Sequence, residues 1–312
     1  MIPDADPALA PTLPFAGELA AVLTACSWAL ASILFARVGG MVGARSLNRS
    51  RVLIAFGFLV ALHLAIEGSA FPTHAAAAQW GWLAVSSIVG LVIGDTLLFT
   101  AYIRVGPRLG TLMMTTVPIF GVTMGFLAFG HGLMPVQLAG IALGVGGVVA
   151  VIADRGSGRS GLTEGRAFRL GLAAGVGAAF CQAVNLVAAK QAMLLGDLSP
   201  LSATVIRTAI AGAVLWAVVA LRGGAVETVR SWARPGIALP LVIGSLIGPA
   251  LGIWLSMIAV RWTHVGVAAT LMALPPVLLI PYDVFVARRR VSAVGIAGTL
   301  VALAGVAVLF NA

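Results

Sequence analysis

A carboxyl group, Asp95, lies within the apolar segment "GLVIGDTLLFTAYIRVG" at residues 90–106. An ionised acid at the centre of a membrane helix costs about 2.5 to 3.5 kcal/mol on insertion scales, so such residues usually face the interior of a protein. We therefore expect Asp95 to point inward, where it could bind a solute or take up and release protons. The alternative is a protonated acid that only joins neighbouring helices.

Other polar side chains fall at a similar depth when residues are counted from the ends of the apolar runs, at about 1.5 Å per helical residue. Trp28, Gln182 and Asn185 lie near the middle of their runs. Thr96 follows Asp95 directly, although such a threonine more often bonds to its own helix backbone. These residues predict a polar layer at mid-depth in which a solute would be bound.

Two further features could belong to this layer. Trp254 and Met257 could form an apolar wall for the solute, although such residues are more often ordinary packing. His63 and Glu67 are four residues apart and share one helix face, so they could relay protons. A structural role is favoured for this pair, because Glu67 falls near the end of its apolar run, where it can reach water or Arg207.

Sites of other kinds are not supported by the sequence. Both cysteines, Cys26 and Cys181, lie inside apolar stretches, which predicts neither a disulfide nor a metal site. No nucleotide-binding motif is present, and we expect no cofactor. An intramembrane enzyme acting on a lipid or isoprenoid substrate is the alternative function. It would need a cluster of acids, histidines or a nucleophile near one membrane face, whereas the ten acids are scattered.

The composition indicates that a membrane surrounds these residues. Of the 312 residues, 60% are hydrophobic and only 9% are charged, with a mean hydropathy of +1.07. A soluble domain would carry about 25% charged residues. The net charge of +9 does not indicate a nucleic-acid partner, because the arginines recur singly or in small groups between apolar runs.

About 20 apolar residues cross a bilayer as a helix, and the chain contains ten such windows. We predict ten transmembrane helices at residues 17–36, 52–67, 80–103, 110–130, 136–153, 170–192, 203–221, 237–260, 266–286 and 291–310.

The arginines predict how these helices are oriented. With ten spans, nearly all of them fall on one membrane face, namely Arg37, Arg45, Arg49, Arg51, Arg104, Arg108, Arg155, Arg159, Arg166, Arg169, Arg222, Arg230, Arg234, Arg288, Arg289 and Arg290. The positive-inside rule makes that face cytoplasmic and places both termini outside. The N-terminus lacks the basic region of a signal peptide, so we expect no cleavage. We expect a multi-pass protein of a bacterial-type inner membrane.

The two halves of the chain are similar to each other. A shift of 158 positions aligns Gly90 and Gly94 with Gly248 and Gly252, while Asp95 aligns with Ile253. Residues 26–36 similarly match residues 180–190, and Arg51 lies near the equivalent of Arg207. We predict one five-helix unit at residues 17–153, a cytoplasmic linker at 154–169 and a second unit at 170–311. An odd number of spans inverts the second unit, which is typical of secondary transporters.

Three features, one of layout and two of sequence, carry a resemblance to a known family. The five-plus-five layout, the "GDTLLFTAYIRVGPRLGTLMMTTVP" block and the "QLAGIALGVGGVVAVI" block resemble the EamA-type transporters of the drug/metabolite transporter superfamily. The resemblance covers nearly the whole chain. It implies a ten-helix basket whose central cavity is lined mainly by spans 1, 3, 4, 6, 8 and 9.

The expected function is therefore secondary transport of a small amino-acid-, drug- or metabolite-like solute by alternating access. We expect proton coupling, with Asp95 and His63 as candidates. The expected partners are the solute and the lipid bilayer. Glycines at close-contact spacing indicate either packing within the bundle or pairing of two copies as a homodimer, and they are Gly140, Gly144, Gly147, Gly298 and Gly305.

Overall fold

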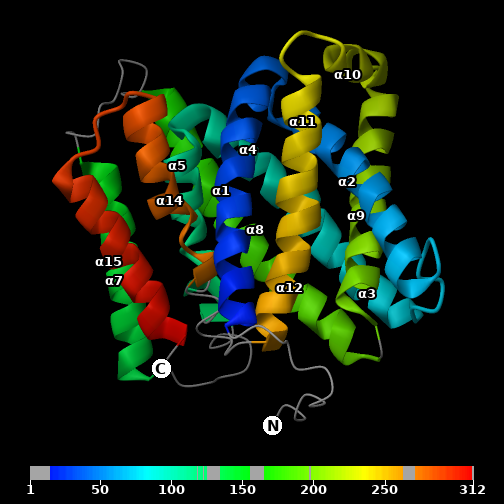
Figure 1. The fold of residues 1–312 in the computed structure, drawn as a ribbon, viewed down its shortest axis with the longest axis horizontal. Coiled ribbons are helices and arrows are strands. Elements are labelled where there is room, and N and C mark those ends of the chain that lie inside the picture. Colours follow the sequence, from blue (N-terminus) through cyan, green and yellow to red (C-terminus); the bar gives the residue numbers. More distant parts are fainter. Residues whose placement is uncertain are drawn as a thin grey trace.

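The structure is a computed structural model. It describes residues 15–117, 119–121, 123–124, 134–154, 165–196, 198–262 and 271–310. Within these ranges all regular structure is helical, and the long helices lie side by side as a bundle (Figure 1). Among the described residues, seven helices are long and apolar enough to cross a membrane, and two shorter apolar helices accompany them.

The first half contains seven helical elements among the described residues, and their order follows the predicted spans. Gly106, with a φ of 87°, ends the third span, and Pro107 starts the next helix at a position where its missing N–H is not needed. The elements are α1 (Ala16–Val42), α2 (Ala44–Glu67), α3 (Ala77–Ser86), η2 (Ser87–Gly94), α4 (Asp95–Val105), α5 (Pro107–Met114) and α7 (Pro135–Ala153). Of these, α3, the π-helical η2 and α4 form one continuous helix.

The second half repeats this order. Its elements are α8 (Arg166–Leu194), α9 (Pro200–Leu221), α10 (Ala225–Trp232), α11 (Ala238–Ser245), η3 (Leu246–Gly252), α12 (Ile253–Trp262), α14 (Pro275–Pro281), η4 (Tyr282–Val286) and α15 (Ala293–Phe310). The π-helical η3 occupies the place in this half that η2 occupies in the first, as the 158-residue shift predicts. Both halves therefore interrupt the third span with a wide turn in which backbone hydrogen bonds skip one extra residue.

Equivalent helices of the two halves run in opposite directions. Gly90 contacts Asn185 and Gly171 contacts Arg104, so α8 is antiparallel to the third span of the first half. In contrast, Phe35 of α1 packs against Phe99 of α4 with ring centroids 5.3 Å apart, and Gly39 contacts Ile103, so α1 is parallel to that span.

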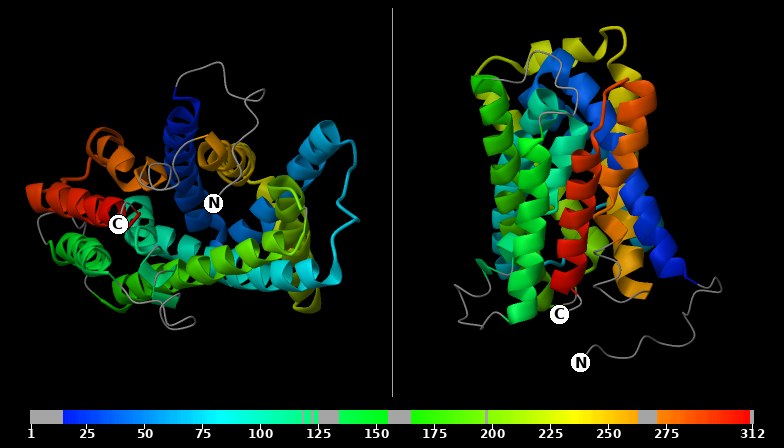
Figure 2. Two further views of the ribbon diagram at one scale, coloured as in Figure 1. Left: turned by 90° about the horizontal axis from the view of Figure 1, so that it is seen from below. Right: turned by 90° about the vertical axis from the view of Figure 1, so that its left-hand side faces the viewer.

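The packing between the halves is reciprocal. Helix α1 packs on η3 and α12 of the second half, while α8 packs on α3, η2 and α4 of the first. Helix α2 packs on its counterpart α9, and α7 packs on its counterpart α15. Figure 1 shows the start of α1 and the end of α15 at the same lower end of the bundle, and Figure 2 shows α7 and α15 side by side.

The glycines predicted at close-contact spacing bring α7 and α15 together. A Cβ added to Gly147 would meet the backbone of Gly298 and Ala302, and one added to Gly305 would meet the backbone of Gly140 and Gly144. Small residues let helix backbones approach closely in lipid. The glycine faces of α7 and α15 therefore form a helix–helix contact within the chain.

Apart from α10, the described helices lie within or overlap the predicted spans, and the main difference is at the start of the second span. Helix α2 begins at Ala44, whereas we predicted residue 52, so the predicted window omits its first two turns. The predicted spans 110–130 and 266–286 lie partly outside the described residues, so they stay predictions over those parts.

Candidate functional site

Asp95 is the first residue of α4, directly after the wide turn of η2, and its side chain is buried, as predicted. It lies about 15 Å from the end of α4 at the usual helical rise. Its carboxylate accepts a hydrogen bond from Nη2 of Arg51 on α2, and the two side chains form an ion pair in which each is 8% exposed. Asp95 is thus a charged partner inside the bundle.

The prediction that Arg51 belongs to the cytoplasmic loops was wrong. Because α2 begins at Ala44, Arg51 lies two turns inside the helix and is buried. Its Nε donates to Oδ1 of Asn48 over 3.3 Å, and its guanidinium carbon lies 4.9 Å from the ring centroid of Phe99. Aromatic packing and a carboxylate together make a buried guanidinium tolerable.

Asn48 holds the wide turn in place. Its Nδ2 donates to the carbonyl oxygen of Leu91 over 2.7 Å and to Oγ1 of Thr96 over 2.9 Å. The hydroxyl of Thr96 in turn donates to the carbonyl oxygen of Val92. Thr96, which we predicted as a solute ligand, therefore bonds to its own helix and to Asn48, which is the alternative that the sequence also allowed.

A second polar group surrounds Arg207 of α9. Its Nη2 donates to Oδ1 of Asn185 over 2.6 Å, and the hydroxyl of Ser86 donates to the same oxygen. Nδ2 of Asn185 donates to Oε1 of Gln182 over 2.6 Å. A Cβ at Gly90 would collide with Asn185, so the glycine is what lets this amide approach η2. The predicted Gln182 and Asn185 therefore lie together.

The two polar groups interact through Asp95, because both Arg51 and Arg207 act electrostatically on its carboxylate. We use the name "midplane layer" for Asn48, Arg51, Asp95, Gln182, Asn185 and Arg207. It lies where α8 and α9 of the second half meet η2 and α4 of the first. The sequence did not indicate the two arginines as site residues, although Arg51 lies near the equivalent of Arg207 in the other half.

The predicted apolar residues are less closely tied to this layer. The indole of Trp28 packs on Gly252 of η3, and Trp28 is 36% exposed. Trp254 on α12 is 44% exposed. Among the described residues, no hydrogen bond joins it to the midplane layer. The side chain of Met257 lies outside the described residues.

His63 belongs to a separate network at the other end of α2. It is fully buried, with Nδ1 2.6 Å from the carbonyl oxygen of Ser69 and Nε2 2.9 Å from Oγ of Ser202. Nε2 also lies 3.1 Å from a carboxylate oxygen of Glu67. Twelve residues, or about 18 Å of helix, separate His63 from Arg51. This network ties α2 to α9.

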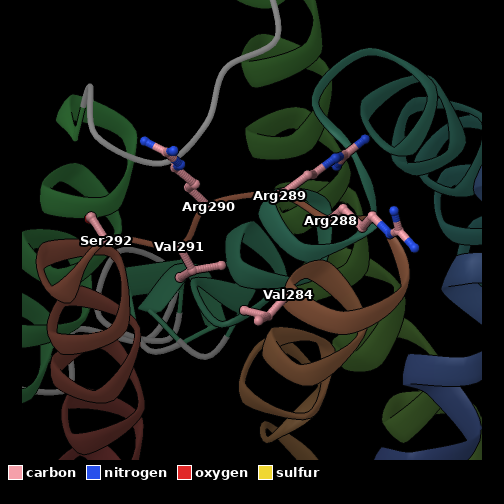
Figure 3. Close-up of a pocket in the computed structure, with 6 residues that line it drawn as sticks. All are labelled: Val284, Arg288, Arg289, Arg290, Val291 and Ser292. Carbon is pink, nitrogen blue, oxygen red and sulfur yellow. The ribbon is translucent and has the colours of Figure 1, made fainter.

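A pocket of about 580 Å³ lies elsewhere, along the connection from η4 to α15 (Figure 3). It is lined by Val284, Arg288, Arg289, Arg290, Val291 and Ser292. Figure 3 shows the three arginine side chains pointing in different directions, so they do not converge on one ligand. The residues that line this pocket include none of the midplane layer. Among the described residues, no three His, Cys, Asp or Glu side chains gather as metal ligands.

The sequence matches the EamA-like transporter family twice, over residues 15–153 and over residues 169–311. The chain belongs to the EamA-like transporter family. With its long apolar helices, this EamA-like protein is a multi-pass membrane protein.

The fold of this EamA-like chain is also found among solved structures. A crystal structure with 19% sequence identity superposes with a TM-score of 0.62, covering 94% of this chain and 95% of the other. At that identity the similarity shows the fold alone. The comparison with curated proteins finds no match.

Proposed function

We propose that this protein is a secondary transporter that moves a small organic metabolite by alternating access at the midplane layer. The observation that carries the proposal is the buried Arg51–Asp95 pair beside Arg207, at a junction between the two halves. Charged residues inside membrane proteins mark solute and ion pathways, and transporter sites lie near mid-depth at the interface between repeats.

The architecture supports this mechanism. We infer ten transmembrane helices in two inverted five-helix units, which meet through the reciprocal contacts of α1 with α12 and of α8 with α4. Two halves with the same packing pattern can exchange conformations and open the layer to either side in turn. No observation on the described residues favours the alternative of an intramembrane enzyme.

We assign proton coupling to Asp95 rather than to His63. Protonation of Asp95 would remove the charge that holds Arg51, so it would free a guanidinium within the layer. His63, in contrast, is fully buried among Ser69, Ser202 and Glu67 at the far end of α2. Its contacts join two helices and do not reach the midplane layer.

The location and assembly follow from the same features. The arginine-rich end of the bundle would face the cytoplasm of a bacterial-type inner membrane, with both termini outside. A homodimer would need a surface other than the glycines of α7 and α15, because those glycines already form a contact within the chain.

Proton coupling is tested in proteoliposomes that contain a pH-sensitive dye. Solutes that raise the Tm of the purified protein are added, and proton movement is followed with Asp95→Asn. In Asp95→Asn we expect the pH dependence of solute-driven proton movement to disappear. Because breaking a buried pair costs about 3 to 5 kcal/mol, the Asp95→Asn, Arg51→Gln double variant serves as the better folded control. Unchanged pH dependence in that double variant would falsify the assignment.

A further inference from the structure

The midplane layer contains one more positive charge than it has negative charges. Arg51 and Arg207 both remain protonated in proteins, whereas Asp95 is the acid that the described part of the layer supplies. Asp95 forms its ion pair with Arg51. Within the described residues the Arg207 guanidinium has the amide oxygen of Asn185 as a partner, but no carboxylate within ion-pair distance.

The donors of Arg207 are also incompletely satisfied. Its Nη2 donates to Asn185, but its Nε is shielded from solvent and has no partner among the described residues. A guanidinium offers five N–H donors in a planar fork, a geometry that fits the two oxygens of a carboxylate. An excess charge at membrane depth is costly, so a structure that keeps one needs an anion from elsewhere.

The imbalance arises because the two halves have diverged at one position. Arg51 of α2 lies near the position that is equivalent to Arg207 of α9, as expected for repeated units. Asp95 of α4, in contrast, aligns with Ile253 of α12. The second half therefore retains the cation and lacks the acid. A solute that carries one negative charge would supply the missing anion.

We propose that the transported solute is a small monocarboxylate whose carboxylate binds Arg207 beside Asn185. This inference names the solute class of the midplane layer and so rests on the proposed transport function. The occupied layer then carries two positive and two negative charges.

Neutralisation would couple binding to the conformational change. Closing a charged site away from water costs more than closing one whose charges are paired. Closure on both sides is therefore less favourable for the empty layer, which has a net positive charge, than for the occupied layer, whose charges balance. An anionic solute would thus be needed for the two halves to rearrange.

The test uses matched pairs of probes that differ in charge and share a skeleton. These are 4-methylpentanoate with 4-methylpentanamide, and phenylacetate with phenylacetamide. The Tm of the purified protein in detergent is measured with each probe at millimolar concentration, fixed pH and fixed ionic strength. We expect both acids to raise the Tm and both amides to leave it unchanged.

Two variants assign the effect to one residue. Arg207→Gln should abolish the shift caused by the acids, and Arg207→Lys, which keeps the charge but loses the fork, should weaken apparent affinity about tenfold to a hundredfold. Arg222→Gln removes a positive charge from the exposed C-terminal end of the same helix and should retain the full shift. If Arg207→Gln does not fold, the Lys variant decides.

Three results would overturn the inference: equal shifts from acids and amides, no shift from either acid, or a full shift in the Arg207 variants. Uptake into proteoliposomes then separates the two proposals. Protein-dependent uptake of the neutral amides without uptake of the acids would leave the transport function standing and reject the anionic solute. Absence of uptake for every probe, together with absence of any Tm shift, would count against both proposals.

Discussion

At the scale of single residues, the midplane layer depends on the buried ion pair between Asp95 and Arg51. An acid inside an apolar segment has to face the protein interior, so its burial followed from the solvent alone. Arg51 was assigned to a loop, because a hydropathy window stops at the first charged residues even where the helix continues past them. Pairing between α2 and α4 depends on tertiary packing, which one sequence does not contain.

The sequence makes His63 a proton-coupling candidate, but its contacts predict a structural effect. His63→Gln should lose the short contacts to the carbonyl oxygen of Ser69 and to the buried hydroxyl of Ser202. Leaving such groups without partners costs about 1 to 3 kcal/mol, so we expect a lower Tm with the pH dependence of proton movement retained. Thermal unfolding and the dye measurement in proteoliposomes test both points.

His74→Gln is the matched control, because His74 is an exposed residue in the connection between α2 and α3. It should change neither property. Loss of pH dependence in His63→Gln, with Asp95 intact, would instead show that His63 relays protons.

At the scale of the elements, apolar runs predicted the helices and the spacing of glycines predicted one contact between them. The glycine spacing of α7 and α15 predicted a close contact, and the structure places that contact within the chain. The sequence could not decide between this arrangement and a dimer, because the same glycines would serve either one. The start of α2 was missed for a related reason, since polar residues such as Asn48 were buried by neighbours that local sequence does not reveal.

Gly147 and Gly146 provide a direct comparison on α7. A side chain at Gly147 would collide with the backbone of α15, whereas one at Gly146 would meet nothing within 4 Å. We expect Gly147→Leu to destabilise the protein by about 1 to 3 kcal/mol or more, which is the usual cost of overpacking. Gly146→Leu should have little effect. Thermal unfolding in detergent gives the comparison, and equal Tm values for the two variants would mean that α7 and α15 are not in close contact.

At the scale of the whole molecule, the internal repeat predicted more than any single motif did. A matching five-helix pattern implied equivalent helices of opposite direction, and α1 and α8 have that relation. The arginines gather at one side of the predicted spans, which predicts a charge asymmetry between the two membrane faces. The sequence did not predict that Arg51 pairs with Asp95 while Arg207 bonds to Asn185, because the two arginines lie at similar positions and differ in the neighbours that tertiary packing brings to them.

The orientation in the membrane is checked by cysteine labelling. In a Cys26→Ala, Cys181→Ala background, we expect His74→Cys to react with a membrane-impermeant maleimide in intact cells. Arg222→Cys should react only after permeabilisation, because α9 ends at the arginine-rich side. The reverse pattern would place the termini in the cytoplasm, and labelling of both sites in intact cells would contradict their placement on opposite sides.

The wide turn of η2 limits which insertions and deletions this segment can accept. A π-helical turn holds one residue more than the regular helix needs, and each residue rotates a helix by about 100°. Removing one residue from η2 would therefore move the Asp95 carboxylate from Arg51 toward a different face, without shortening the span enough to matter to the bilayer. Insertions and deletions in this segment should be selected against because of rotational phase, even where hydrophobicity and length remain suitable for a membrane.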